Sequence, residues 1–169
     1  MVTSPKSIVL AGGCFWGMEE LFRKRPGVVD TEAGYTGGPN AHPTYEDHAG
    51  HAEALKVVYD PAQTSFEDLL DFFFQIHDPT TPNRQGNDIG TSYRSAIFYA
   101  NEDERKTAEA FIAHVNASKR WSDPVATTLE PLGTFTPAES YHQDYLQKNP
   151  GGYTCHFVRS GGSYLPRAR

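Results

Sequence analysis

Positive charge is scarce in this sequence. The 169 residues carry 15 lysines and arginines against 21 aspartates and glutamates, a net charge of −6 at pH 7. A protein that binds nucleic acid normally presents a basic face, so this balance argues against that class. Long apolar runs are also missing, because Phe72-Phe73-Phe74 is flanked by Asp71 and Gln75. We therefore expect neither nucleic-acid nor membrane partners.

Cysteine is equally scarce, with Cys14 and Cys155 near opposite ends of the chain. The first residues form no extended apolar segment, which indicates no signal peptide and a cytoplasmic protein. In that compartment two cysteines are more often catalytic or redox-active than structural. Their positions in the sequence leave open whether they meet.

Short apolar runs alternate with helical patterns along the chain. Strands are predicted at 7–11, 28–35, 52–59, 93–100 and 125–130, and helices at 15–22, 65–76, 102–119 and 137–148. This order indicates an α+β fold, a two-layer sandwich with a mixed sheet and a ferredoxin-like βαββαβ core. We predict one catalytic domain over 1–169, in which 150–169 is a flexible, glycine-rich segment that carries the second cysteine.

Cys14 lies where the first strand gives way to the first helix. The preceding Gly12 and Gly13 allow a sharp turn. Unpaired N–H groups at a helix N-terminus stabilise an anion, which predicts a lowered thiol pKa. Phe15 and Trp16 follow at once and resemble a wall for an apolar ligand group. A small, inert, buried cysteine under a helix is the alternative interpretation.

Glu53 lies near the start of a strand that otherwise reads as buried. Burial of this carboxyl would raise its pKa and keep it protonated, so that it could donate a proton in catalysis. An exposed glutamate with an ordinary pKa is the alternative. His42, His48 and His51 precede it, but their spacing matches no standard zinc pattern, and we predict no metal site.

Two further stretches are rich in polar and aromatic groups. Asp88 and Tyr93 lie where a long loop runs into a strand, and together they could bind a polar oxygen; ordinary turn chemistry explains them equally well. Cys155 follows Gly151-Gly152, which would let it swing toward an oxidised partner as a resolving thiol. A bystander thiol in a loose tail is the alternative.

Taken together, these stretches resemble the A-type peptide-methionine (S)-S-oxide reductases from about residue 8 to 157. Four short segments carry the resemblance in the order of that family: Gly12-Gly13-Cys14-Phe15-Trp16-Gly17, Gly50-His51-Ala52-Glu53, Gln85-Gly86-Asn87-Asp88 with Tyr93-Arg94-Ser95, and His142-Gln143 with Tyr145-Leu146. Two features depart from the family pattern. The loop from Tyr45 to Gly50 is shorter than in many members, and Ser92 stands where glutamine is common.

The resemblance implies a role for each candidate residue. It makes Cys14 the nucleophile that becomes a sulfenic acid and Glu53 the proton donor. The sulfoxide oxygen and methyl would be held by separate groups: Tyr45, Tyr93 and Asp88 on the polar side, Phe15 and Trp16 on the apolar side.

The resemblance also implies how the enzyme is recycled. No cysteine follows Cys155, so reduction would end in one Cys14–Cys155 disulfide, which thioredoxin would reduce without a bound cofactor. The expected enzyme is a monomer that repairs methionine (S)-sulfoxide, free or in proteins. The alternatives are another two-cysteine oxidoreductase, such as a thiol peroxidase, and a non-catalytic module that binds oxidised peptides.

Overall fold

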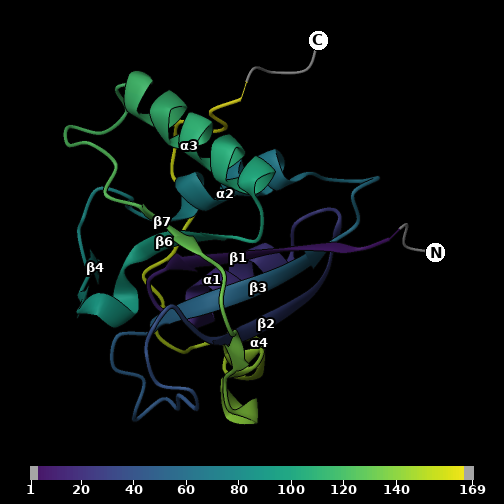
Figure 1. Cartoon of the computed structure of the whole chain (residues 1–169), viewed down its shortest axis with the longest axis vertical. Helices are drawn as coiled ribbons and strands as arrows, with labels where there is room; N and C mark the ends of the chain where they lie inside the picture. Colours follow the sequence, from purple (N-terminus) through teal and green to yellow (C-terminus); the bar gives the residue numbers. More distant parts are fainter. Residues whose placement is uncertain (1–3, 166–169) are drawn as a thin grey trace.

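A computed structural model describes residues 4–165 as a six-stranded sheet with helices on one face (Figure 1). The elements in chain order are β1 (Lys6–Gly12), α1 (Phe15–Arg23), β2 (Val28–Thr36), β3 (Ala52–Tyr59), α2 (Phe66–Ile76), β4 (Arg84–Gln85), β5 (Asp88–Ile89), β6 (Ser95–Tyr99), α3 (Glu102–Ala117), β7 (Thr128–Pro131), β8 (Thr136–Pro137) and α4 (Tyr145–Lys148). Two 3-10 turns complete them, η1 (Thr91–Tyr93) and η2 (Ser140–His142).

The sheet has the strand order β7-β6-β1-β3-β2-β8. Its four central strands are antiparallel neighbours in the order β6-β1-β3-β2, and β7 adds to β6 in parallel, so the sheet is mixed. This central order, fourth strand, first, third and second, is that of a ferredoxin-like βαββαβ core. The predicted fold class is confirmed. Among residues 4–165, no helix is both long and apolar enough to cross a bilayer.

The main core lies between the sheet and its helices. Figure 1 shows α2 and α3 together at the top of the view and α1 behind the strands. Alternate residues of β3, Leu55, Val57 and Tyr59, join Met18 of α1 and other buried side chains in this core. Because strand residues two apart share a face, Glu53 points toward the same layer as Leu55. The sheet thereby directs a carboxyl under the N-terminus of α1.

Capping side chains fix the starts of two helices. Ser65 caps α2 by accepting a hydrogen bond from the Asp68 N–H, and Asn101 caps α3 in the same way. The predicted helix over 137–148 is wrong, because β8, η2 and the short α4 replace it. Asp144 adopts a left-handed conformation with φ 53°, and the Gln143 side chain bonds both backbone groups of Ala33 on β2. These tertiary bonds interrupt the helix.

The predicted segment 150–169 runs beyond the part of the chain that the structure describes, since 166–169 lie outside it. Within that part, its first half packs back against α1. A Cβ built on Gly17 would lie 2.3 Å from Nδ1 of His156 and 2.4 Å from Oγ1 of Thr154. Only the missing side chain at Gly17 permits this close approach.

Candidate active site

Cys14 occupies the turn that the sequence predicted, between the end of β1 and the start of α1. It is the N-cap residue of α1 and is only 7% exposed. Gly13 has φ +96°, and a Cβ there would lie 2.7 Å from the Gln85 side chain. A glycine is thus needed both for the backbone conformation and for the packing of the 78–92 loop against the turn.

The expected lowering of the Cys14 pKa is wrong for the resting protein. Burial raises the pKa of this thiol well above its ordinary value, and the charges of Glu53 and Asp88 raise it further. The backbone N–H of Trp16 at the helix N-terminus opposes these effects but is outweighed. The sulfur is therefore held as a neutral thiol.

Glu53 lies directly beside the Cys14 turn. Its carboxyl is 1% exposed, and its Oε1 accepts a hydrogen bond from the Phe15 N–H at 3.2 Å. Burial raises the pKa of Glu53 to about 8, which the Asp88 charge assists and the Phe15 bond opposes. Of the two interpretations that the sequence left open, the buried carboxyl with a raised pKa is the one that the structure has. At neutral pH the group is mostly a carboxylic acid and can donate a proton.

This raised pKa predicts a pH dependence of stability. An ordinary glutamate titrates near 4.5, whereas folded Glu53 titrates near 8. Between these values the folded protein binds more protons than the unfolded chain, so the unfolding free energy falls as pH rises. Between pH 4 and 9 we expect the unfolding free energy of wild type to fall by roughly 3–5 kcal/mol more than that of Glu53→Gln. Denaturant unfolding at each pH measures this loss, and parallel curves for the two proteins would contradict it.

Tyr45 and Tyr93 reach the same centre from two different loops. Burial raises the pKa of both phenols, and the charge of Glu53 raises both further. Cys14 and Asp88 act on both tyrosines in the same direction. The phenols remain protonated near neutral pH and are available as hydrogen-bond donors. The structure thus brings these five predicted residues together.

Phe15 and Trp16 form the apolar side of the centre. Phe15 is buried, and Trp16 stacks on Tyr145 with ring centroids 3.9 Å apart and an interplanar angle of 9°. The indole N–H of Trp16 donates to Nδ1 of His142 at 3.0 Å. The His142 ring also lies 4.4 Å from the Tyr45 ring. Aromatic side chains from the C-terminal part of the chain therefore fix the position of Trp16, on the apolar side of the site.

His142 and Tyr145 received no individual role from the sequence. Glu139 received none either. Its Oε2 accepts the Tyr45 N–H at 3.0 Å, and its Oε1 accepts the Tyr35 hydroxyl at 2.8 Å. The signal that could have found them is the density of aromatic and polar residues over 139–145. Because the supporting contacts span about a hundred residues of sequence, spacing alone does not reveal them.

Cys155 is a second free thiol, and its charge is among the effects that raise the Cys14 pKa, after those of burial, Glu53 and Asp88. The neighbouring His156 is buried, and its Nε2–H donates to the Gly12 carbonyl at 2.6 Å. Two acceptors stand 3.9 Å from the Cys155 sulfur: Oδ2 of Asp88 and Nδ1 of His156. Asp88 also accepts the Tyr153 hydroxyl at 3.2 Å. Asp88 raises the pKa of both thiols, which indicates that it lies near each of them.

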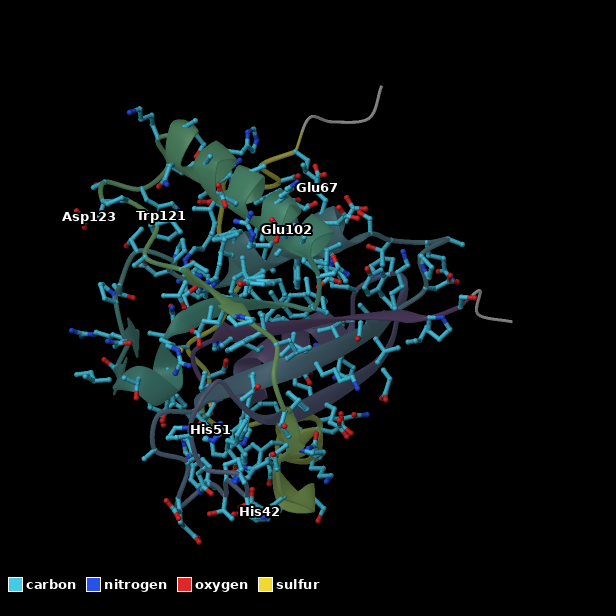
Figure 2. All side chains as sticks on the ribbon, in the orientation of Figure 1. His42, His51, Glu67, Glu102, Trp121 and Asp123 are labelled. Atoms are coloured by element: carbon cyan, nitrogen blue, oxygen red, sulfur yellow. The ribbon has the colours of Figure 1, made fainter. Side chains whose placement is uncertain are left out.

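The loop histidines organise the 37–51 loop, at the lower end of the molecule in Figure 2. His51 accepts the Gly38 N–H at Nδ1 and bonds the Asn40 carbonyl through Nε2. His48 bonds the Thr44 carbonyl and the Ser92 hydroxyl. Within residues 4–165, no group of three or more histidine, cysteine or acidic side chains is arranged to hold a metal ion.

Comparison with known proteins agrees with this site. Residues 6–164 match the family model described as peptide methionine sulfoxide reductase. The chain is 62% identical over 163 residues to a curated peptide methionine sulfoxide reductase, MsrA, of Mycolicibacterium gilvum, and covers 96% of each sequence.

Solved structures agree as well. Reduced Mxr1 of Saccharomyces cerevisiae superposes with a TM-score of 0.86 at 40% identity, over 92% of this chain and 93% of that one. Mxr1 in complex with Trx2 superposes with a TM-score of 0.64 at 31% identity, over 92% and 91% of the two chains. The match of nearly the whole chain to the family model, together with 62% identity to a curated relative, shows that the chain belongs to the peptide methionine sulfoxide reductase family.

Proposed function

We propose that this enzyme, a thiol-dependent peptide methionine sulfoxide reductase, reduces the S epimer of methionine sulfoxide, free or in proteins, with Cys14 as nucleophile and Glu53 as acid. The observation that carries the proposal is the link between them. Phe15, the residue after the thiol, donates its N–H to the buried carboxyl at 3.2 Å. A nucleophile and a proton donor are thereby held side by side, as reduction of a sulfoxide requires.

The first step transfers the sulfoxide oxygen to Cys14. Because two adjacent buried anions are costly, the resting site keeps both acids protonated. As the Cys14 sulfur bonds to the sulfoxide sulfur, Glu53 gives its proton to the oxygen, and the thiol proton restores the acid. The hydroxyl then passes from the substrate sulfur to the Cys14 sulfur as the bond between the two sulfurs breaks. Cys14 becomes a sulfenic acid, two electrons remain on the substrate sulfur, and methionine leaves.

The surroundings fix how the substrate lies during this step. The phenols of Tyr45 and Tyr93 donate to the sulfoxide oxygen, and charge developing there strengthens these bonds in the transition state. Asp88 orders the polar side beside them. Phe15 and Trp16 receive the methyl group on the opposite side. A fixed apolar side and a fixed polar side distinguish two mirror-related sulfoxides by shape.

The second step forms a disulfide between Cys14 and Cys155. The Cys155 proton passes to one of the acceptors 3.9 Å away, Asp88 or His156. The sulfur then attacks the sulfenic sulfur, the S–S bond forms as the S–O bond breaks, and the hydroxide leaves as water after taking a proton. Packing of His156 against Gly12 supports this assignment, because it brings Cys155 toward the Cys14 turn.

Thioredoxin is the proposed external reductant of this disulfide. The related Mxr1 has been solved in complex with Trx2, and a low-potential dithiol of that class can reduce a disulfide within reach. The chemistry above uses only protein thiols and acids, so the proposal includes no bound cofactor. It also has the enzyme act as a monomer in the cytoplasm, where reduced thiols are maintained.

An NADPH-coupled thioredoxin assay with each epimer tests the proposal. We expect turnover with methionine (S)-sulfoxide, free and within a peptide, and little or none with the R epimer. Hydrogen peroxide is the comparison substrate, because a thiol peroxidase would also pass through a sulfenic acid. Faster turnover with peroxide than with either sulfoxide would contradict the proposal.

A further inference from the structure

We infer that His48 and Ser92 form a side-chain strut that positions Tyr45 and Tyr93, so that their hydroxyls can act together on one substrate oxygen. The inference rests on the proposed function, since it concerns the groups that hold the sulfoxide. His48 and Ser92 do not themselves touch the reacting atoms in this account. They are positioning residues.

The His48 ring is fixed at both of its nitrogens. Nδ1 lies 2.8 Å from the Thr44 carbonyl oxygen, which can only accept, so Nδ1 carries the proton. In the neutral ring Nε2 is then an acceptor, and it takes the Ser92 hydroxyl proton at 2.9 Å. The Tyr35 ring stacks on the imidazole with centroids 4.9 Å apart and an interplanar angle of 24°. Two hydrogen bonds and a stacked ring leave the imidazole one orientation.

The strut joins the two segments that carry the substrate-binding tyrosines. Tyr45 lies three residues before His48, and their rings are 6.2 Å apart. Tyr93 follows Ser92 directly in η1. The two segments belong to separate loops, one before β3 and one before β6. The His48–Ser92 bond crosses between them and sets how far apart they lie.

A second contact, between Glu139 and the Tyr45 backbone, restricts the same loop. The Tyr45 N–H is held by Glu139, which also accepts the Tyr35 hydroxyl, so the start of the 45–48 segment is already fixed. Tyr35 therefore contacts both Glu139 and His48. The remaining freedom is rotation of the 45–48 segment toward or away from η1. The His48–Ser92 bond removes it, which orients both phenols before substrate binds.

The pair can be altered without disturbing the core. An open surface cavity of about 270 Å³ lies beside it and is lined by both partners, and neither side chain is fully buried. Replacement should therefore leave the folded state intact. A thermal unfolding midpoint measured for each variant verifies this.

A double-mutant cycle tests the inference. Wild type, His48→Ala, Ser92→Ala and the double variant are mixed in excess with a methionine (S)-sulfoxide peptide, and methionine formed in one turnover is followed by rapid quench. We expect each single variant to slow the limiting single-turnover rate roughly 10-fold, and the double variant to be no slower than either. The enzyme concentration giving half the limiting rate should change less than about two-fold, because orientation of the donors acts mainly in the transition state.

Two further variants sharpen the test. Ser92→Thr keeps the hydroxyl and should retain the wild-type rate within about three-fold. His42→Ala removes an exposed histidine of the same loop and should have no effect. Independent, multiplying losses in the double variant, or wild-type rates in both single variants, would overturn the inference. Failure of wild type itself to form methionine would instead overturn the proposed function.

Discussion

Glu53→Gln is expected to slow methionine formation about 10²–10⁴-fold while leaving sulfoxide binding nearly unchanged. Glutamine has almost the same shape and can still accept the Phe15 N–H at its side-chain oxygen, so the Cys14 turn should keep its geometry. It has no acidic proton to give to the sulfoxide oxygen. The measurement is the single-turnover rate with methionine (S)-sulfoxide at saturating concentration, near pH 7.

The pH profile separates loss of the acid from general damage. Burial raises the pKa of Glu53 to about 8, so the wild-type rate should fall above that pH as the carboxyl ionises. Glu53→Gln should lack this limb. Glu67→Gln is the matched control, because Glu67 is exposed on α2 and lies on the side of the molecule that Figure 2 shows next to α3. An unchanged rate in Glu53→Gln would remove this residue from its proposed role.

The sequence predicted the parts of the site that local patterns determine. Glycines before Cys14 and an aromatic helical pattern after it placed the thiol on a turn, and the turn is present. The strand around Glu53 left a buried or an exposed carboxyl open, and the structure shows the buried one. The turn at Cys14 and the strand around Glu53 both depend on residues close by in the sequence. Hydrophobic periodicity and turn residues therefore indicate them directly.

The charge state of Cys14 could not be predicted in the same way. A helix N-terminus is visible in the sequence, and its effect on the pKa has the expected sign through the Trp16 N–H. The larger effects come from burial and from Glu53, which lies 39 positions further along the chain, and Asp88, 74 positions further along, adds a smaller one. Their strength depends on distances that exist only in the folded protein. The last predicted helix failed for a similar reason, because Gln143 bonds Ala33 across the fold.

The contacts that hold Phe15 and Trp16 in place could not be predicted from the sequence either. Phe15 and Trp16 suggested a place for a methyl group, but nothing in their own segment shows what holds them. The indole of Trp16 is fixed from 139–145, through His142 and the stacked Tyr145. The order of the four motifs supported the family, whereas the contacts between them required the structure.

Cys155→Ser is expected to release about one methionine per enzyme and then stop when thioredoxin is the reductant. The first step uses Cys14 and Glu53 and should proceed at the wild-type rate. Without the second thiol, Cys14 remains a sulfenic acid, and no Cys14–Cys155 disulfide forms for thioredoxin to reduce. The measurement pairs a quenched single turnover with the steady-state NADPH-coupled rate, which should fall at least 100-fold.

A small thiol distinguishes this outcome from misfolding. Dithiothreitol can reduce an accessible sulfenic acid directly, so it should restore multiple turnovers to Cys155→Ser. Thr154→Ser in the same segment keeps the hydroxyl that accepts the His156 N–H and should behave as wild type with thioredoxin. Wild-type thioredoxin-driven turnover by Cys155→Ser would exclude Cys155 as the resolving thiol. Thioredoxin would then have to react with the oxidised Cys14 itself, which is only 7% exposed, and the packing of His156 on Gly12 would serve the fold alone.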